Sequence, residues 1–226
     1  MGDSDKVKIF KFADDTTVVG LISNNDETDY RNKVSRLALW CRHNNLSLNV
    51  DKTKEIVVDF RKMHAQHAPL TINGTTVERV GSTKFLGVHV SEDLSWSRNT
   101  ASLAKKAHQR LYFLRKLKRA GAPTPIMCTF YRGAIESVLT SCITVWFGAC
   151  TASCRKTLQR IVRAAEKIVG TSFPSLHDLH STRLTRKALC MAGDPTHPLH
   201  SFFSLLLSGR RLQSLQTRAS RLRDSS

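Results

Sequence analysis

The sequence lacks long hydrophobic runs. No segment reaches the roughly eighteen consecutive apolar residues that a membrane-spanning helix needs. Its start, Met1 to Lys8, is polar and charged, unlike the basic and then apolar start of a signal peptide. We therefore expect no membrane partner and an intracellular location, in the cytoplasm or the nucleus.

The sequence also lacks the cysteine density of a disulfide-rich scaffold, with six cysteines in a chain of 226. They lie in apolar, helix-like surroundings, and a chain of this length can bury a core without disulfides, so we expect reduced thiols. Three pairs have spacings that suggest zinc, namely Cys150 and Cys154, His177 and His180, and His197 and His200. No set of four has the spacing of a zinc finger, which favours structural or surface roles.

Acidic residues are few and unevenly placed. The chain has 18 Asp and Glu against 35 Lys and Arg, a net charge of +17. Residues 1–96 hold 13 of each sign, whereas residues 97–226 hold 22 basic and 5 acidic residues. A solvated surface could carry this charge, but a neutral half followed by a basic half is more typical of a catalytic module joined to a nucleic-acid-binding module.

The periodicity predicts an α+β fold with a boundary near residue 97. Residues 8–13 and 16–22 are rich in β-branched and aromatic residues, which predicts a hairpin with Asp14 and Asp15 at its tip. A helix is predicted from Asp26, its N-cap, to Asn44. Further strands are predicted at 55–60, 70–72, 75–77 and 84–90, with Asn73-Gly74 as a hairpin turn between the second and the third.

Helical periodicity dominates after Ser97. We predict long helices over about 97–120, 126–138 and 151–169 and a shorter one over 182–191, and we leave residues 142–150 unassigned. The first of these helices has an apolar face at Leu103, Ala107, Leu111 and Leu114. We thus divide the chain into residues 1–96, a basic helical region over 97–194, and a basic, flexible tail over 195–226.

Several short motifs occur along the chain, and their order is more specific than any one of them alone. They are Phe12-Ala-Asp-Asp15, Trp40-Cys-Arg-His-Asn-Asn-Leu46, Leu48-Asn-Val-Asp-Lys-Thr-Lys-Glu55, Phe85-Leu-Gly-Val88, Ala107-His-Gln-Arg-Leu111 and Thr196-His-Pro-Leu-His200. In this order they resemble the C-terminal part of the reverse transcriptase of vertebrate non-LTR retrotransposons of the long interspersed element class. The resemblance implies a partial antiparallel palm sheet with a covering helix, followed by a basic, all-helical thumb.

The resemblance also implies roles for individual residues. Asp14 and Asp15 would be catalytic Mg²⁺ ligands, and Lys52 would lie beside the incoming nucleotide; turn formation and a solvated loop lysine are the alternatives. Phe85, Leu86 and Gly87 would support the primer end, although packing would also explain them. The template-primer backbone of RNA or DNA would lie along a set of exposed cations: Lys105, Lys106, Arg110, Arg115, Lys116, Lys118 and Arg119.

A polymerase of this family also needs a third aspartate on a neighbouring strand and a fingers subdomain. Phe12 lies eleven residues after the first residue of the chain, and Asp3 and Asp5 belong to the same short lead-in. We therefore expect no polymerase activity from this chain alone, unless a complementing chain supplies the missing parts. The alternative is a relic that binds nothing specific.

A second resemblance concerns Trp40 to Lys62, which is similar to the short N-terminal segment of AlkB-like tRNA dioxygenase-methyltransferases. Iron ligation in such a dioxygenase requires a His-x-Asp pair, and none of the nine histidines has an aspartate two positions later. The glycine-rich loop of the methyltransferase is also missing. We expect a shared segment without either activity.

Overall fold

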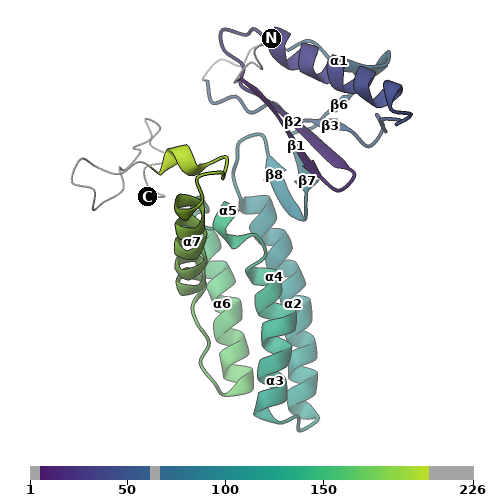
Figure 1. Ribbon diagram of the computed structural model, residues 1–226. Coiled ribbons are helices and arrows are strands. Elements are labelled where there is room, and N and C mark those ends of the chain that lie inside the picture. The colour runs from purple at the N-terminus through teal and green to yellow at the C-terminus, as the bar shows by residue number, and fades with distance from the viewer. Residues whose placement is uncertain (1–5, 62–66, 204–226) are drawn as a thin grey trace, which may run out of the picture. The chain divides into compact units, whose positions relative to one another are not determined.

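The computed structural model describes residues 6–61 and 67–203, and the chain divides into two compact units (Figure 1). Unit 1 comprises Met1–Lys84 and Ser91–Leu94, and unit 2 comprises Phe85–Val90 and Ser95–Ser226. Most of the predicted flexible tail, residues 204–226, lies outside the described residues. Unit 1 contains short strands and one helix and unit 2 is largely helical, which confirms the α+β class.

The predicted hairpin is present, but its turn is displaced by one residue. Strands β1 (Val7–Phe12) and β2 (Asp15–Gly20) pair antiparallel, with Phe12 opposite Asp15. The turn is therefore Ala13-Asp14 rather than Asp14-Asp15, and Ala13 has a φ of 53°.

Helix α1 (Thr28–His43) covers part of the small strands of unit 1. Its N-cap position is Glu27, one residue after the predicted Asp26, and the Asp26 carboxylate accepts a hydrogen bond from the Thr28 N–H at 3.0 Å. The helix buries Val34 and Ala38 in a small core completed by residues from the following strands: Leu70, Ile72 and Val77.

The remaining strands of unit 1 are very short. β4 (Thr71–Ile72) and β5 (Thr75–Thr76) form the predicted hairpin around Asn73-Gly74, both with positive φ, as a two-residue hairpin turn requires.

The predicted strand at 55–60 is reduced to β3 (Lys54–Glu55), which pairs parallel with β6 (Glu78–Arg79). Within the described residues the strands form four separate pairs rather than one antiparallel palm sheet.

A further hairpin carries the chain from unit 1 into unit 2. Its strands are β7 (Ser82–Phe85) and β8 (Val88–Ser91), joined by Leu86 and Gly87. Both turn residues have positive φ, 45° and 88° respectively.

Two long helices form the centre of unit 2 and lie side by side (Figure 1). Helix α2 (Ser97–Arg119) buries the predicted apolar face at Leu103, Ala107, Leu111 and Leu114. Helix α6 (Ala152–Val169) packs against it along an apolar stripe: Leu158, Ile161, Val162 and Ala165. The Thr151 hydroxyl caps α6 by accepting the Cys154 N–H, and Gly170 ends it with a φ of 81°.

The predicted helix over 126–138 is interrupted by a stretch of π-helix. It consists of α3 (Thr124–Phe130), the π-helix η1 (Tyr131–Glu136) and α4 (Ser137–Leu139). A π-turn inserts a residue into the helical repeat, which leaves no trace in an apolar pattern read at 3.6 residues per turn.

The segment left unassigned, 142–150, contains the short helix α5 (Ile143–Trp146). The Trp146 side chain is fully buried, and its indole N–H donates to the Ser141 carbonyl at 2.8 Å.

Helix α7 (Leu176–Gly193) begins well before the predicted residue 182, because the Ser175 hydroxyl caps it by accepting the Asp178 N–H at 3.1 Å. A single 3₁₀ turn, η2 (His200–Phe202), follows. No helix in residues 6–61 or 67–203 is both long and apolar enough to cross a membrane.

Candidate nucleic-acid interface

The two hairpin aspartates are exposed at the end of β1 and β2. Asp14 is in the turn and Asp15 is the first ladder residue of β2. In the described part of the chain, neither these carboxylates nor the cysteine and histidine pairs belong to a group of three side chains that could hold a metal ion. Two exposed carboxylates do not fit a resident two-metal centre, so Mg²⁺ binding here stays a prediction.

Lys52 lies in a well-defined polar loop. Its main-chain N–H donates to Asn49 Oδ1 at 3.1 Å, and the Thr53 hydroxyl donates to the Asn49 carbonyl at 2.8 Å. The Lys52 side chain is exposed. Among the described residues no hydrogen bond or ion pair joins it to Asp14 or Asp15, so the predicted role beside a nucleotide rests on the resemblance.

The segment predicted to support a primer is the tip of the β7–β8 hairpin. Phe85 is 39% exposed and Leu86 is 44% exposed. A leucine in the left-handed region is unfavourable, so the turn places an apolar side chain in solvent at a conformational cost. That combination is compatible with contact to a ligand; primer support itself stays a prediction.

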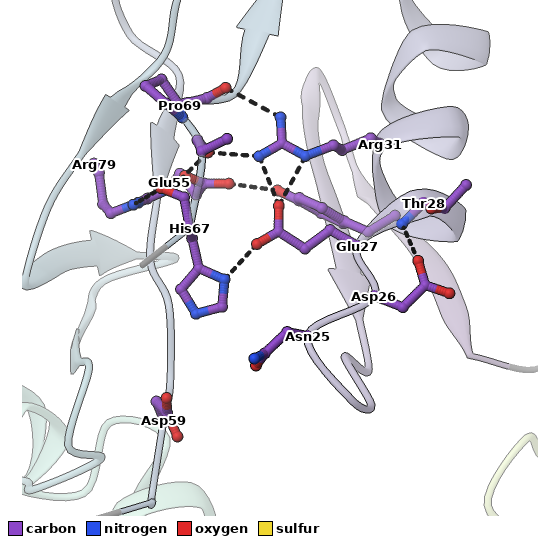
Figure 2. Close-up of polar contacts among 12 residues, drawn as sticks. Asn25, Asp26, Glu27, Thr28, Arg31, Glu55, Asp59, His67, Pro69 and Arg79 are labelled. Carbon is purple, nitrogen blue, oxygen red and sulfur yellow. Dashed lines mark hydrogen bonds and ion pairs between the residues drawn. The ribbon is translucent and has the colours of Figure 1, made fainter. Parts of the chain in front are cut away.

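A partly buried polar cluster in unit 1 was not expected from the sequence (Figure 2). The Glu27 carboxylate lies between Arg31, whose Nε donates at 2.8 Å, and Nδ1 of His67. Arg31 also donates to the main-chain carbonyl groups of Ala68 and Pro69. Glu27 and Arg31 thereby hold the chain at residues 67–69 against the start of α1.

A second ion pair of the cluster joins β3 to β6. Nε of Arg79 donates to Glu55 at 3.0 Å, and the same guanidinium donates to the carbonyl groups of His67 and Ala68. Glu55 is buried, with its side chain 7% exposed. The Tyr30 hydroxyl completes the carboxylate's contacts at 3.4 Å.

These contacts change the acidity of two groups. Burial raises the pKa of Glu27, but the hydrogen bonds from His67 and Arg31 outweigh it and hold that pKa below its ordinary value. Burial together with the nearby Glu55 carboxylate raises the pKa of Tyr30 to about 12. The charged groups of the cluster are paired with one another, and the two arginines donate to main-chain carbonyl groups. The cluster therefore stabilises the fold of unit 1 and is not a reactive centre.

The principal cationic surface of unit 2 lies on α2, which contains no acidic residue. Six of the seven cations predicted to bind nucleic acid are exposed, and among the described residues none of them pairs with a carboxylate: Lys105, Lys106, Arg115, Lys116, Lys118 and Arg119. The apolar face of α2 is buried, so these cations are displayed on the remaining helix surface.

Arg110, the seventh predicted cation, is held differently. It is half-buried, and its guanidinium donates to the carbonyl group of Ala134 in the π-helix. A π-helix does not form the usual main-chain hydrogen bonds between residues i and i+4. Arg110 supplies a hydrogen bond to the carbonyl group of Ala134 within this irregular stretch. It therefore has a structural role in addition to the one expected.

Helix α6 contributes further positive charge that the sequence reasoning did not single out. It carries one glutamate and five cations: Arg155, Lys156, Arg160, Arg163 and Lys167. Arg155 is engaged locally, since its Nε donates to the Cys150 carbonyl at 3.1 Å. Like charges on adjacent helices repel one another unless a polyanion neutralises them.

Comparison with protein families gives one match to this helical region. The model described as "Alkylated DNA repair protein alkB homolog 8, N-terminal" matches residues 96–137, the segment that contains α2, α3 and η1. The family is the one expected, but the match does not fall on the predicted residues 40–62. It covers less than half of the chain.

Comparison with curated proteins gives a relative from a transposon. The chain is 23% identical over 119 residues to the "Probable RNA-directed DNA polymerase from transposon BS" of Drosophila melanogaster, a match that covers 52% of this chain and 13% of that protein. No solved structure matches the chain. The chain is therefore distantly similar to a small part of a transposon RNA-directed DNA polymerase.

Proposed function

We propose that this chain is part of the RNA-directed DNA polymerase of a non-LTR retrotransposon and that unit 2 binds the template-primer backbone. The transposon relative supports the polymerase origin, and its printed activity implies a nucleic-acid substrate. The finer assignment, to the C-terminal part of a vertebrate long interspersed element, rests on the motifs from Phe12 to His200.

One observation carries the binding proposal: α2 has a buried apolar face and an exposed cationic face without a single carboxylate. A helix of this kind attracts phosphates along its length, and each phosphate contact releases condensed counterions. Binding through α2 must therefore weaken steeply as salt rises.

Salt dependence tests the proposal directly. For an RNA–DNA duplex, we expect the triple variant Lys116→Gln, Lys118→Gln, Arg119→Gln to bind more weakly than the parent chain. The slope of log affinity against log salt should fall by about 3, roughly one for each cation removed. The measurement is fluorescence anisotropy over a series of salt concentrations.

A matched control removes the same charge from unit 1. The variant Lys8→Gln, Arg36→Gln, Arg42→Gln changes three exposed cations there and should keep the parent slope. Equal slopes for the two triple variants would refute binding through α2. Aggregation, or binding without a defined slope, would favour the alternative that the chain is an inert relic.

The isolated chain is expected to lack polymerase activity. Asp14 and Asp15 are two exposed carboxylates, and catalysis of phosphoryl transfer depends on complete positioning of metals and substrate. On a primed RNA template with Mg²⁺, the parent and Asp14→Ala should give the same background extension. Extension by the parent that Asp14→Ala abolishes would contradict this expectation and would establish an active centre at the hairpin.

The AlkB-related match does not lead us to propose dioxygenase chemistry. The matched residues, 96–137, form α2, α3 and η1, and the sequence has no His-x-Asp pair. A helical segment shared with that family is compatible with a common binding role.

A further inference from the structure

An apolar groove lies on unit 2 between α2 and the segment formed by α3 and η1. It is a shallow depression that is open to solvent, with a volume of about 820 Å³. Phe113 and Leu117 line it from α2, and Phe130 and Gly133 line it from the other side. Phe113 is 56% exposed, so the groove presents an aromatic face to solvent.

Gly133 of the π-helix leaves space in this groove. At Gly133 an added Cβ would meet no atom within 4 Å, so the missing side chain leaves free space above the backbone. The bond from Arg110 to the Ala134 carbonyl ties α2 to η1 beside this space. The groove is therefore supported by a specific contact between its two walls.

The margin of the groove is cationic. Arg110 and Lys116 are among its lining residues, and no lining residue is acidic. The Lys116 ammonium lies 5.5 Å from the centre of the Tyr112 ring, and that ring meets Phe113 edge to face. An occupant must therefore offer a flat, apolar body together with negative charge.

We propose that this groove takes an unpaired base of single-stranded RNA or DNA, with the adjoining phosphate on Lys116. The proposal rests on the nucleic-acid function proposed above and makes it more specific. Bases in a duplex are paired and stacked, so only an unpaired base can offer its face to Phe113. Aromatic rings interleaved with cations, as at Tyr112, Phe113, Arg115 and Lys116, suit a single strand better than an acidic protein helix.

Two substitutions test the groove in opposite ways. Phe113→Ala removes the stacking surface, and its cost in stability is small because the ring is largely exposed. Gly133→Leu fills the free space instead. Each should weaken binding of the full chain to an oligothymidylate of roughly 16 nucleotides by about tenfold and leave affinity for a duplex of the same length within about twofold.

Matched controls separate stacking from general effects. Leu189→Ala truncates another exposed apolar side chain of unit 2, on α7, and should change neither the single-strand nor the duplex affinity. Phe113→Trp keeps an aromatic ring at this position and should retain single-strand binding. With 2-aminopurine in the oligonucleotide, the parent should change the fluorescence of the probe and Phe113→Ala should not.

The possible outcomes distinguish this proposal from the one on which it rests. Unchanged single-strand affinity in both Phe113→Ala and Gly133→Leu would overturn the groove proposal, as would equal losses for single strand and duplex. Binding of an acidic amphipathic peptide would also overturn it if that binding required Phe113 but displaced neither the oligothymidylate nor the duplex. The groove would then bind a protein partner. A normal salt slope in the α2 charge variant would instead refute backbone binding.

Discussion

Replacing Arg79 by alanine is expected to destabilise unit 1 by about 3 kcal/mol, because it leaves the Glu55 carboxylate buried without its cation. Among the described residues, the Tyr30 hydroxyl at 3.4 Å would be left as the side-chain donor to that carboxylate. The substitution also removes the donors to the carbonyl groups of His67 and Ala68. Amide hydrogen exchange, read in α1 and β3, measures the free energy of opening of unit 1.

Two controls define what this result means. Arg36→Ala changes an exposed arginine of α1 and should alter the same free energy by less than about 0.5 kcal/mol. Adding Glu55→Gln to Arg79→Ala removes the buried charge and should recover part of the loss, so that the two changes are not additive. If Arg79→Ala behaved like Arg36→Ala, the cluster would not be holding unit 1 together.

Unit 1 is also expected to lose stability in acid before unit 2 does. The pKa of Glu27 is lower in the folded protein than its ordinary value of 4.5. A lowered carboxyl pKa contributes stability that is present above pH 4.5 and is lost as the pH falls through the folded value. Protonation weakens the contacts of Glu27 with Arg31 and His67, at a cost of about 1.5 kcal/mol.

Amide signals in ¹H–¹⁵N spectra, followed from pH 6 to pH 3, measure this loss for each unit separately. Signals from α1 should weaken at a higher pH than signals from α6. Glu27→Gln should be less stable at neutral pH and should show a flatter acid profile. Simultaneous loss of both helices, or an unchanged profile in Glu27→Gln, would mean that Glu27 does not control the acid response.

Local sequence signals were sufficient for the elements that they specify directly. The Asn73-Gly74 turn and the apolar stripe of α2 are each encoded within a few residues, and both were predicted. The hairpin at Asp14 was predicted with its turn one residue too late, because β-branched flanks indicate two strands but not their register.

Features that depend on distant residues could not be predicted in this way. The polar cluster joins segments that are far apart in the sequence, around Glu27–Arg31, Glu55 and His67–Arg79. The Glu27–Arg31 pair, four residues apart on one helix turn, was a local signal, but its partners were not. The π-helix is not revealed by periodicity, and the groove beside it is lined by Gly133 and by the contact between Arg110 and Ala134, which lie on different helices. Asp14, Asp15 and Lys52 are located by the fold, while their roles still rest on the resemblance.

The central claim is that α2 lies against the nucleic-acid backbone, and lysine footprinting tests it most directly. The protein is acetylated with and without an RNA–DNA template-primer, and each lysine is quantified by mass spectrometry. We predict protection of Lys105, Lys106, Lys116 and Lys118 on α2 and none of Lys8 on β1. Equal modification of the α2 lysines in both samples, with the nucleic acid bound, would contradict the claim.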